Sequence, residues 1–281
     1  MFLLGPPYHY LENTLPLCNT KCFPYLCDSL LKHIMTITAK FEQAHFQAKQ
    51  NKWMRYFTVF TRVALAIGFL PSGFVNIAGE RFTSLSVHHP MGQYLEALHH
   101  TGYYYTFIGV LQVTAAILLL IPRTAILGAL LYFPIILNIC ILSLAVRFEG
   151  SLVSSPLMVL ANLYLLWWDF DRLKFILLPR SLQRLDEPLK KDALTNKFPI
   201  KFFASTFVTV LIVVLLLTNA YSIMPRNTLK DCQTQCRDSR KSKACYNFCD
   251  CIHKQGRLLD SCLKEYRAAP LDKDTTSTIK N

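Results

Sequence analysis

Long apolar stretches alternate with short polar connectors along most of this chain of 281 residues. Between Ile108 and Asp171, three apolar runs are interrupted only by residues 121–123 and 147–150. Connectors this short make neighbouring helices antiparallel and adjacent. Each run has 17 or more residues with almost no charge, so each can cross an apolar layer roughly 30 Å thick. The five predicted spans are Phe57–Gly79, Tyr103–Ile121, Thr124–Val146, Leu152–Trp168 and Phe202–Tyr221.

The pattern predicts an all-α membrane protein: a four-helix transmembrane bundle, a fifth transmembrane helix and a small disulfide-stapled helical hairpin. The segment before the bundle is predicted to be cytoplasmic and partly disordered, with a basic surface helix at its end, and Met35 and Met54 are alternative starts. The expected domains are residues 1–55, the bundle 56–170, a basic cytoplasmic connector 171–201, the fifth span 202–221 and an extracytoplasmic cysteine-rich domain with tail 222–281.

The composition agrees with a membrane protein, because 52% of the residues are hydrophobic and 17% are charged. The net charge is +12, but the basic residues lie mainly beside apolar runs. Their expected partners are therefore anionic lipid headgroups rather than nucleic acid, for which no motif is present.

Five polar side chains interrupt the spans and are predicted to face the bundle interior, since lipid offers them no partner. Arg62 has two readings, as a side chain that reaches back to the near membrane surface or as the partner of a polar group inside the bundle. Buried amides usually join helices through hydrogen bonds. The five residues are Arg62, Asn76, Gln112, Asn138 and Asn162.

The connector between the first two spans contains two histidine pairs and a helical pattern. Met91, Tyr94, Leu95 and Leu98 recur at helical spacing, which predicts a short helix lying on the membrane. Adjacent histidines point to different sides of a helix, so solvated imidazoles are favoured over a metal or proton-transfer site.

Two patterns set the expected orientation. With a cytoplasmic N-terminus, the cytoplasmic flanks contain 13 Lys and Arg residues and the opposite flanks contain 7. A cluster of six cysteines within about 30 residues is typical of a disulfide-stapled domain, which forms outside the cytoplasm. Both patterns place the C-terminus outside.

The cysteine spacing favours two short antiparallel helices. Cysteines four residues apart share one helix face, so a hairpin turning at residues 237–244 brings two pairs opposite one another. The favoured disulfides are Cys232–Cys249, Cys236–Cys245 and Cys251–Cys262. The alternatives are a redox-active pair at Cys249 and Cys251, or a metal site formed by Cys245, Cys249, Cys251 and His253.

Residues 55–177 resemble DoxX-like membrane proteins. The resemblance rests on Arg62–Ala78, on PRTAILGALL at 122–131, on LYFPIILNICILSLAVRF at 131–148 and on LANLYLLWWDFDRLK at 160–174. It implies a four-helix bundle in the bacterial inner membrane and a redox-associated role, since the family includes a subunit of a thiosulfate:quinone oxidoreductase. Family members often have a lysine in the first helix and an acidic residue in the second, where this chain has Asn76 or a neighbour and Gln112.

Two functions therefore compete. The first is an accessory subunit, linked to quinone or thiol chemistry, that binds a quinone or a partner oxidoreductase. The second is a non-enzymatic scaffold or assembly factor whose stapled hairpin binds an extracytoplasmic protein, and transport is a weaker third. The spans contain no haem-ligand pair, and the chain has no CxxC motif and no flavin or nicotinamide motif, so no catalytic residue is assigned.

Overall fold

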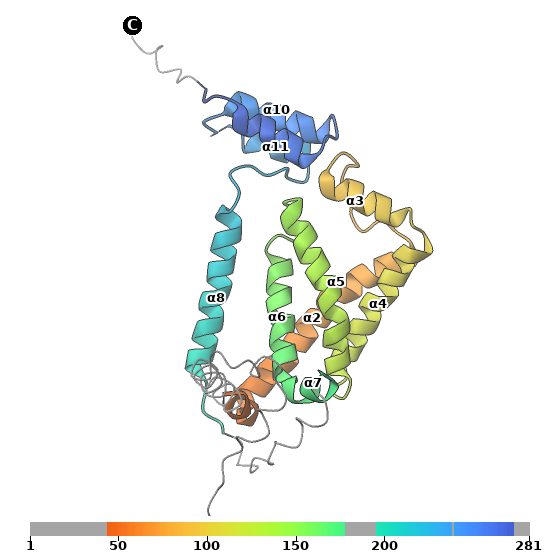
Figure 1. The fold of residues 1–281 in the computed structure, drawn as a ribbon, viewed down its shortest axis with the longest axis vertical. Coiled ribbons are helices and arrows are strands. Elements are labelled where there is room, and N and C mark those ends of the chain that lie inside the picture. The colour runs from red at the N-terminus through yellow and green to blue at the C-terminus, as the bar shows by residue number, and fades with distance from the viewer. Residues whose placement is uncertain (1–43, 178–194, 238, 273–281) are drawn as a thin grey trace, which may run out of the picture. The chain divides into compact units, whose positions relative to one another are not determined.

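The computed structural model describes residues 44–177, 195–237 and 239–272 (Figure 1). These residues fall into two compact units, one formed by residues 44–54 and 195–197 and the other by the remainder. In the smaller unit, residues 44–50 are helical, and the Asn51 side chain donates a hydrogen bond to the carbonyl oxygen of Lys197 over 2.7 Å. The cysteines at positions 18, 22 and 27 lie outside the described residues.

The larger unit contains the expected helical bundle, so the predicted fold class is confirmed. Four helices are long and apolar enough to cross a membrane, which indicates a membrane protein. The apolar runs become helices because they carry almost no charge and satisfy their backbone groups internally. The four are α2 (Lys52–Ala78), α4 (Tyr103–Leu120), α5 (Ala125–Ala145) and α8 (Ile200–Asn219).

The fourth predicted span is shorter than its apolar run. Helix α6 (Ser154–Trp168) has 15 residues, which at 1.5 Å per residue gives a length of about 22 Å. It nevertheless belongs to the bundle, because its inner face packs against α5. The short helix α7 (Phe170–Leu177) follows at once and extends into the predicted connector 171–201.

Helix α2 contacts three other helices in turn along its length. Near its beginning, the Thr58 hydroxyl lies 2.9 Å from the Tyr164 hydroxyl of α6. In its middle, the Phe69 ring stacks on Tyr132 of α5, with 3.6 Å between centroids. Near its end it meets α4. Figure 1 shows this oblique course.

The contact between α2 and α4 requires two glycines. A Cβ atom on Gly109 would lie 2.7 Å from the carbonyl oxygen of Gly73 and 2.9 Å from the backbone nitrogen of Ile77. These distances to backbone are too short for any larger residue, so the two helices approach at their main chains. That approach positions the polar side chains one turn further along.

Helix α8 stands beside the bundle rather than within it. None of its residues is buried, and its main contact is with α6. At one end of α8, the Phe202 ring lies 5.9 Å from the Tyr164 ring of α6 and 5.5 Å from the Phe57 ring of α2, so aromatic side chains make these contacts. An apolar helix with no buried residue is expected to face lipid over most of its surface.

The segment after α8 folds into the expected stapled hairpin with a third helix. The disulfide Cys232–Cys249 joins α9 (Leu229–Thr234) to α10 (Ser242–His253), and Cys236–Cys245 joins the turn after α9 to α10. The third, Cys251–Cys262, joins α10 to α11 (Leu259–Ala268). These are the pairs that the spacing favours. Phe248 and Ile252 complete a small core around the buried sulfurs.

Candidate functional site

A cavity of about 410 Å³ lies inside the bundle and is the candidate functional site. Helices α2, α4, α5 and α6 form its walls, and α3 (Pro90–His99) covers one side. Most of the lining is aliphatic or aromatic, and within the described residues it contains no carboxylate, amine or imidazole. A cavity of this size and character suits a drug-sized apolar molecule with a few polar groups.

Two predicted interior residues meet at the cavity wall. The Asn76 amide donates a hydrogen bond from Nδ2 to Oε1 of Gln112 over 3.1 Å, and both side chains are buried. Asn76 Oδ1 is also buried but has no hydrogen-bond partner. A buried carbonyl oxygen without a partner costs free energy, so a ligand that donated a hydrogen bond here would bind favourably.

Asn138 lies apart from this pair but lines the same cavity. Its side chain is exposed rather than packed among helices, which corrects the expectation that it forms an interhelical bond. In the described part of the chain, no hydrogen bond of its side chain is present. The cavity is open at this point, so the Asn138 amide can reach a ligand or water.

The structure places the other two predicted residues away from the cavity. Asn162 is fully buried and donates to the carbonyl oxygen of Ala129 over 3.1 Å, so it joins α6 to α5. Arg62 forms an ion pair with Asp169 at an N–O distance of 2.9 Å. Sequence reasoning missed Asp169, although a lone carboxylate directly after Trp168 was the available signal.

Helix α3 is the expected surface helix, and it covers the cavity. Its apolar face contributes Met91, Tyr94, Leu95 and Leu98 to the lining. Pro90 starts the helix, and the His89 ring caps it by accepting a hydrogen bond from the Met91 backbone nitrogen over 3.1 Å. The predicted solvated histidine at position 89 is therefore wrong, because its ring is buried.

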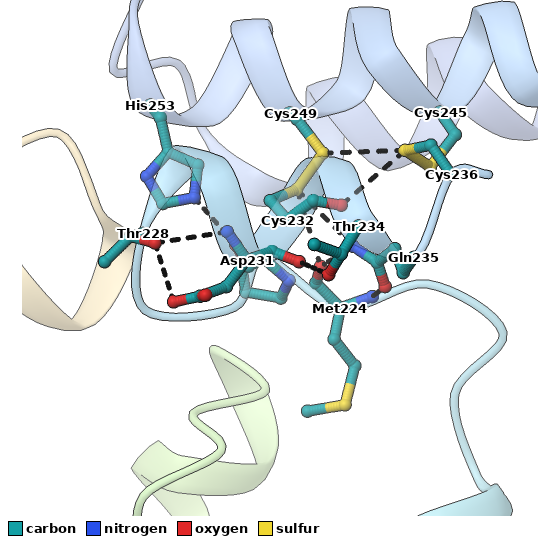
Figure 2. The surroundings of a disulfide bond; sticks show 11 residues. Met224, Thr228, Asp231, Cys232, Thr234, Gln235, Cys236, Cys245, Cys249 and His253 are labelled. Atoms are coloured by element: carbon teal, nitrogen blue, oxygen red, sulfur yellow. Dashed lines mark hydrogen bonds between the residues drawn. A yellow bond between two sulfur atoms is a disulfide. The ribbon is translucent and has the colours of Figure 1, made fainter.

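The cysteine-rich domain holds the beginning of α3. The His89 ring lies 5.9 Å from the His253 ring of α10, and Gln93 donates to the carbonyl oxygen of Gly256 over 3.1 Å. Figure 2 shows His253 beside the disulfides, and its Nε2 donates to the carbonyl oxygen of Pro225 over 2.7 Å. The helix that covers the cavity is thus anchored to the disulfide-bonded core.

The alternative metal site is not formed. Cys245, Cys249 and Cys251 are each oxidised to disulfides with other cysteines, so none offers a thiolate. The sulfurs of Cys236, Cys245 and Cys249 lie within 4.8 Å of one another because the first two disulfides are stacked (Figure 2). Cys249 and Cys251 do not pair with each other, so the redox-active pair is absent as well.

Acid should loosen the contact between α3 and the cysteine-rich domain. The pKa of His89 is lowered from 6.5 to about 4, mainly by burial and also by the nearby His253, against the opposing effect of a hydrogen bond with the Arg226 backbone. As the pH falls, the His89 ring of the unfolded chain is therefore protonated before that of the folded chain. The contribution of the neutral ring to the free energy of unfolding is complete above pH 6.5 and is lost as the pH falls towards 4. The change over this window is about 3 kcal/mol.

We expect His89→Asn to flatten the decrease in melting temperature between pH 7 and pH 4.5, because asparagine can cap the helix without titrating. The measurement is thermal unfolding of the purified protein across this range. His100→Asn, at the exposed opposite end of α3, should keep the wild-type slope. Equal slopes for wild type and His89→Asn would contradict the assignment.

The fold and the site together define the class of this protein as a helical membrane protein with a bundle cavity and a disulfide-stapled domain. Among known proteins, the chain is 47% identical over 73 residues to the uncharacterized protein YwoB of Bacillus subtilis (strain 168). The match covers 26% of this chain and 46% of that protein. No family model matches the chain. No solved structure matches it either.

Proposed function

We propose that this chain is a DoxX-like membrane protein whose bundle binds a neutral lipophilic molecule of the quinone and quinol type. One observation carries the proposal: the buried Asn76 Oδ1, which has no hydrogen-bond partner, lies at the wall of an apolar cavity of about 410 Å³. A quinol hydroxyl is a donor of the kind that this oxygen lacks, and the aliphatic lining suits the ring. The Asn138 amide offers a second polar contact for the opposite oxygen.

The chemistry of the lining favours binding over turnover. Quinone reduction needs groups that transfer protons, and apart from two tyrosines the described lining has no titratable side chain. DoxX-like proteins often have a lysine in the first helix and an acidic residue in the second, and in this chain the neutral Asn76–Gln112 pair stands in their place. The role that fits is an accessory subunit that holds the molecule for a partner oxidoreductase.

The test is ligand binding by the purified full-length chain. A short-chain menaquinol analogue kept reduced, and its quinone, would be titrated into the detergent-solubilised protein and followed by quenching of tryptophan fluorescence. We expect Asn76→Leu to weaken quinol binding about ten-fold, which corresponds to the loss of one hydrogen bond of about 1.4 kcal/mol. Because Asn76 Oδ1 can only accept a hydrogen bond, and the quinol hydroxyl is a donor whereas the quinone oxygen is not, the quinol should lose more affinity than the quinone.

Asn162→Leu is the matched control, because it removes an equally buried amide that does not line the cavity. It should change stability but leave the affinity of the folded protein unchanged. Saturable binding to wild type that Asn76→Leu does not weaken would contradict the assignment of the cavity. If the wild type bound neither the quinol nor the quinone, the accessory role would have no support.

We also propose that the N-terminus is cytoplasmic and the cysteine-rich domain is outside. The charge count supports this orientation, and three disulfides are expected only in an oxidising compartment. It requires five crossings, so the short helix α6 must span the membrane together with its flanking residues. The bacterial inner membrane is the compartment implied by the resemblance.

A scaffold role is the second candidate. Around the core of the cysteine-rich domain, apolar and aromatic side chains are also exposed: Leu258 directly before α11, Tyr246 and Leu271. Exposed apolar side chains on a rigid, stapled domain can contact a partner protein. Absence of quinol binding would move the proposal to this role.

A further inference from the structure

A cavity of about 730 Å³ outside the bundle lies where the membrane-spanning helices meet the cysteine-rich domain. Leu144 and Ala145, at the end of α5, form one side of it. Tyr221, just beyond the end of α8, forms another, and its hydroxyl donates to the carbonyl oxygen of Leu144 over 3.2 Å. A tyrosine at the ends of two spanning helices is typical of the headgroup level of a bilayer.

Three cations converge on this cavity. Arg147 comes from the loop after α5, and Lys264 and Arg267 come from one face of α11. Asp260 is the one acidic residue among the described lining, so the cavity carries an excess of two positive charges. Apolar side chains occupy the rest of the lining, among them Leu263 of α11.

Arg147 is held in place by its neighbours. Its guanidinium donates to the carbonyl oxygen of Ile223 over 2.9 Å and lies 4.4 Å from the centroid of the Tyr221 ring. Burial lowers the pKa of Arg147 and Arg267 lowers it further, while Tyr221 and Asp260 act in the opposite direction. Arg147 therefore contributes a fixed, partly desolvated positive charge, which an anion would stabilise.

The two cations of α11 differ from the other charges nearby. Arg257 pairs with Glu265, Lys254 with Asp250 and Arg226 with Glu149. By contrast, Lys264 and Arg267 are exposed, and in the described part of the chain neither forms a salt bridge. Two exposed cations beside the half-buried Arg147 give the cavity a positive charge that suits an anion.

We propose that this cavity binds the phosphate of an anionic phospholipid headgroup. Arginine and lysine side chains are the groups that bind phosphate in proteins. Leu144 and Ala145, at the end of the spanning helix α5, give the cavity an apolar side that suits the glycerol and the first carbons of the acyl chains. A bound lipid would join the cysteine-rich domain to the membrane surface, independently of the bundle cavity.

The test measures thermal stabilisation of the delipidated full-length protein in mixed micelles. Added phosphatidylglycerol should raise the melting temperature of the wild type, and phosphatidylcholine should not. In Lys264→Gln/Arg267→Gln, the lipid concentration needed for half of the shift should rise about 30-fold, because each cation near a lipid surface contributes about a factor of five.

Two further variants separate charge from folding. Lys230→Gln/Lys243→Gln removes the same net charge from exposed positions outside the cavity and should behave as wild type. Lys264→Arg/Arg267→Lys retains the charges and should also bind. Intact disulfides in each variant show that the domain is folded.

Equal stabilisation of wild type and Lys264→Gln/Arg267→Gln by phosphatidylglycerol would overturn the proposal. Inorganic phosphate and glycerol phosphate form a separate arm of the experiment. If either stabilised the wild type as much as the lipid did, and lost its effect in the same variant, the site would belong to a free phosphate and the lipid assignment would be wrong.

Discussion

Arg62→Met should lower the stability of the bundle by about 3 kcal/mol, because it leaves the Asp169 carboxylate buried without its partner. The two side chains are 12% and 9% exposed, and their N–O distance is 2.9 Å. A buried charge that loses its counter-charge keeps its full desolvation penalty. We expect a decrease in melting temperature of roughly 6–12 °C in detergent, since 1 kcal/mol corresponds to about 2–4 °C for a chain of this size.

The double variant Arg62→Met/Asp169→Leu distinguishes a buried pair from a surface one. Removing both charges should restore most of the lost stability, because no unpaired charge is left. Arg81→Met is the matched control, since the ion pair of Arg81 with Glu96 is much more exposed, at 39% and 29%, and ion pairs near the surface contribute about 1 kcal/mol or less. If Arg62→Met had as small an effect as Arg81→Met, Arg62 would instead reach back to the membrane surface.

Replacing Cys232 and Cys249 together by serine should unfold the cysteine-rich domain and leave the bundle folded. The disulfide closes a loop with a sequence separation of 17, and removal of such a crosslink costs about 3 kcal/mol. A domain of this size has too small a core to withstand that loss. The measurement is limited proteolysis, in which cleavage should appear in residues 222–272 before it appears in the bundle.

Both cysteines must be replaced, because a single Cys232→Ser would leave a thiol on Cys249. Its sulfur lies 3.9 Å from that of Cys236, so the thiolate could attack the neighbouring disulfide and release Cys245. Ile77→Ala, an exposed change on α2, is a control that should not alter cleavage of the domain. Mass mapping of the unreduced wild type tests the pairing itself. Six free thiols there would contradict the disulfides and the extracytoplasmic orientation.

The contacts of Arg62, of the glycines and of the cysteine-rich domain all hold helices that line the bundle cavity. Arg62 and Asp169 hold the beginning of α2 against the end of α6, and the glycine contact with α4 holds its other end. Beside the glycine contact, α2 contributes Asn76 to the cavity wall. The disulfide-bonded domain holds α3 over the same cavity through Gln93. Changes far from the cavity are therefore expected to alter its shape.

The sequence by itself determined the helices, because apolar runs and their periodicity are properties of neighbouring residues. The all-α membrane class, the surface helix over 91–100 and the stapled hairpin could all be predicted in this way. The cysteine pairs could be predicted because residues four apart on a helix share a face, so an antiparallel hairpin limits which sulfurs can meet.

Only the tertiary structure decided which distant side chains meet. Asn76 and Gln112 are 36 residues apart, and Arg62 and Asp169 are 107 apart. Their contacts depend on the angle at which α2 crosses the bundle, and that angle follows from the glycine contact and the packing of side chains. For the same reason, the burial of His89 and the opening beside Asn138 could not be predicted, since each depends on where another element ends in space.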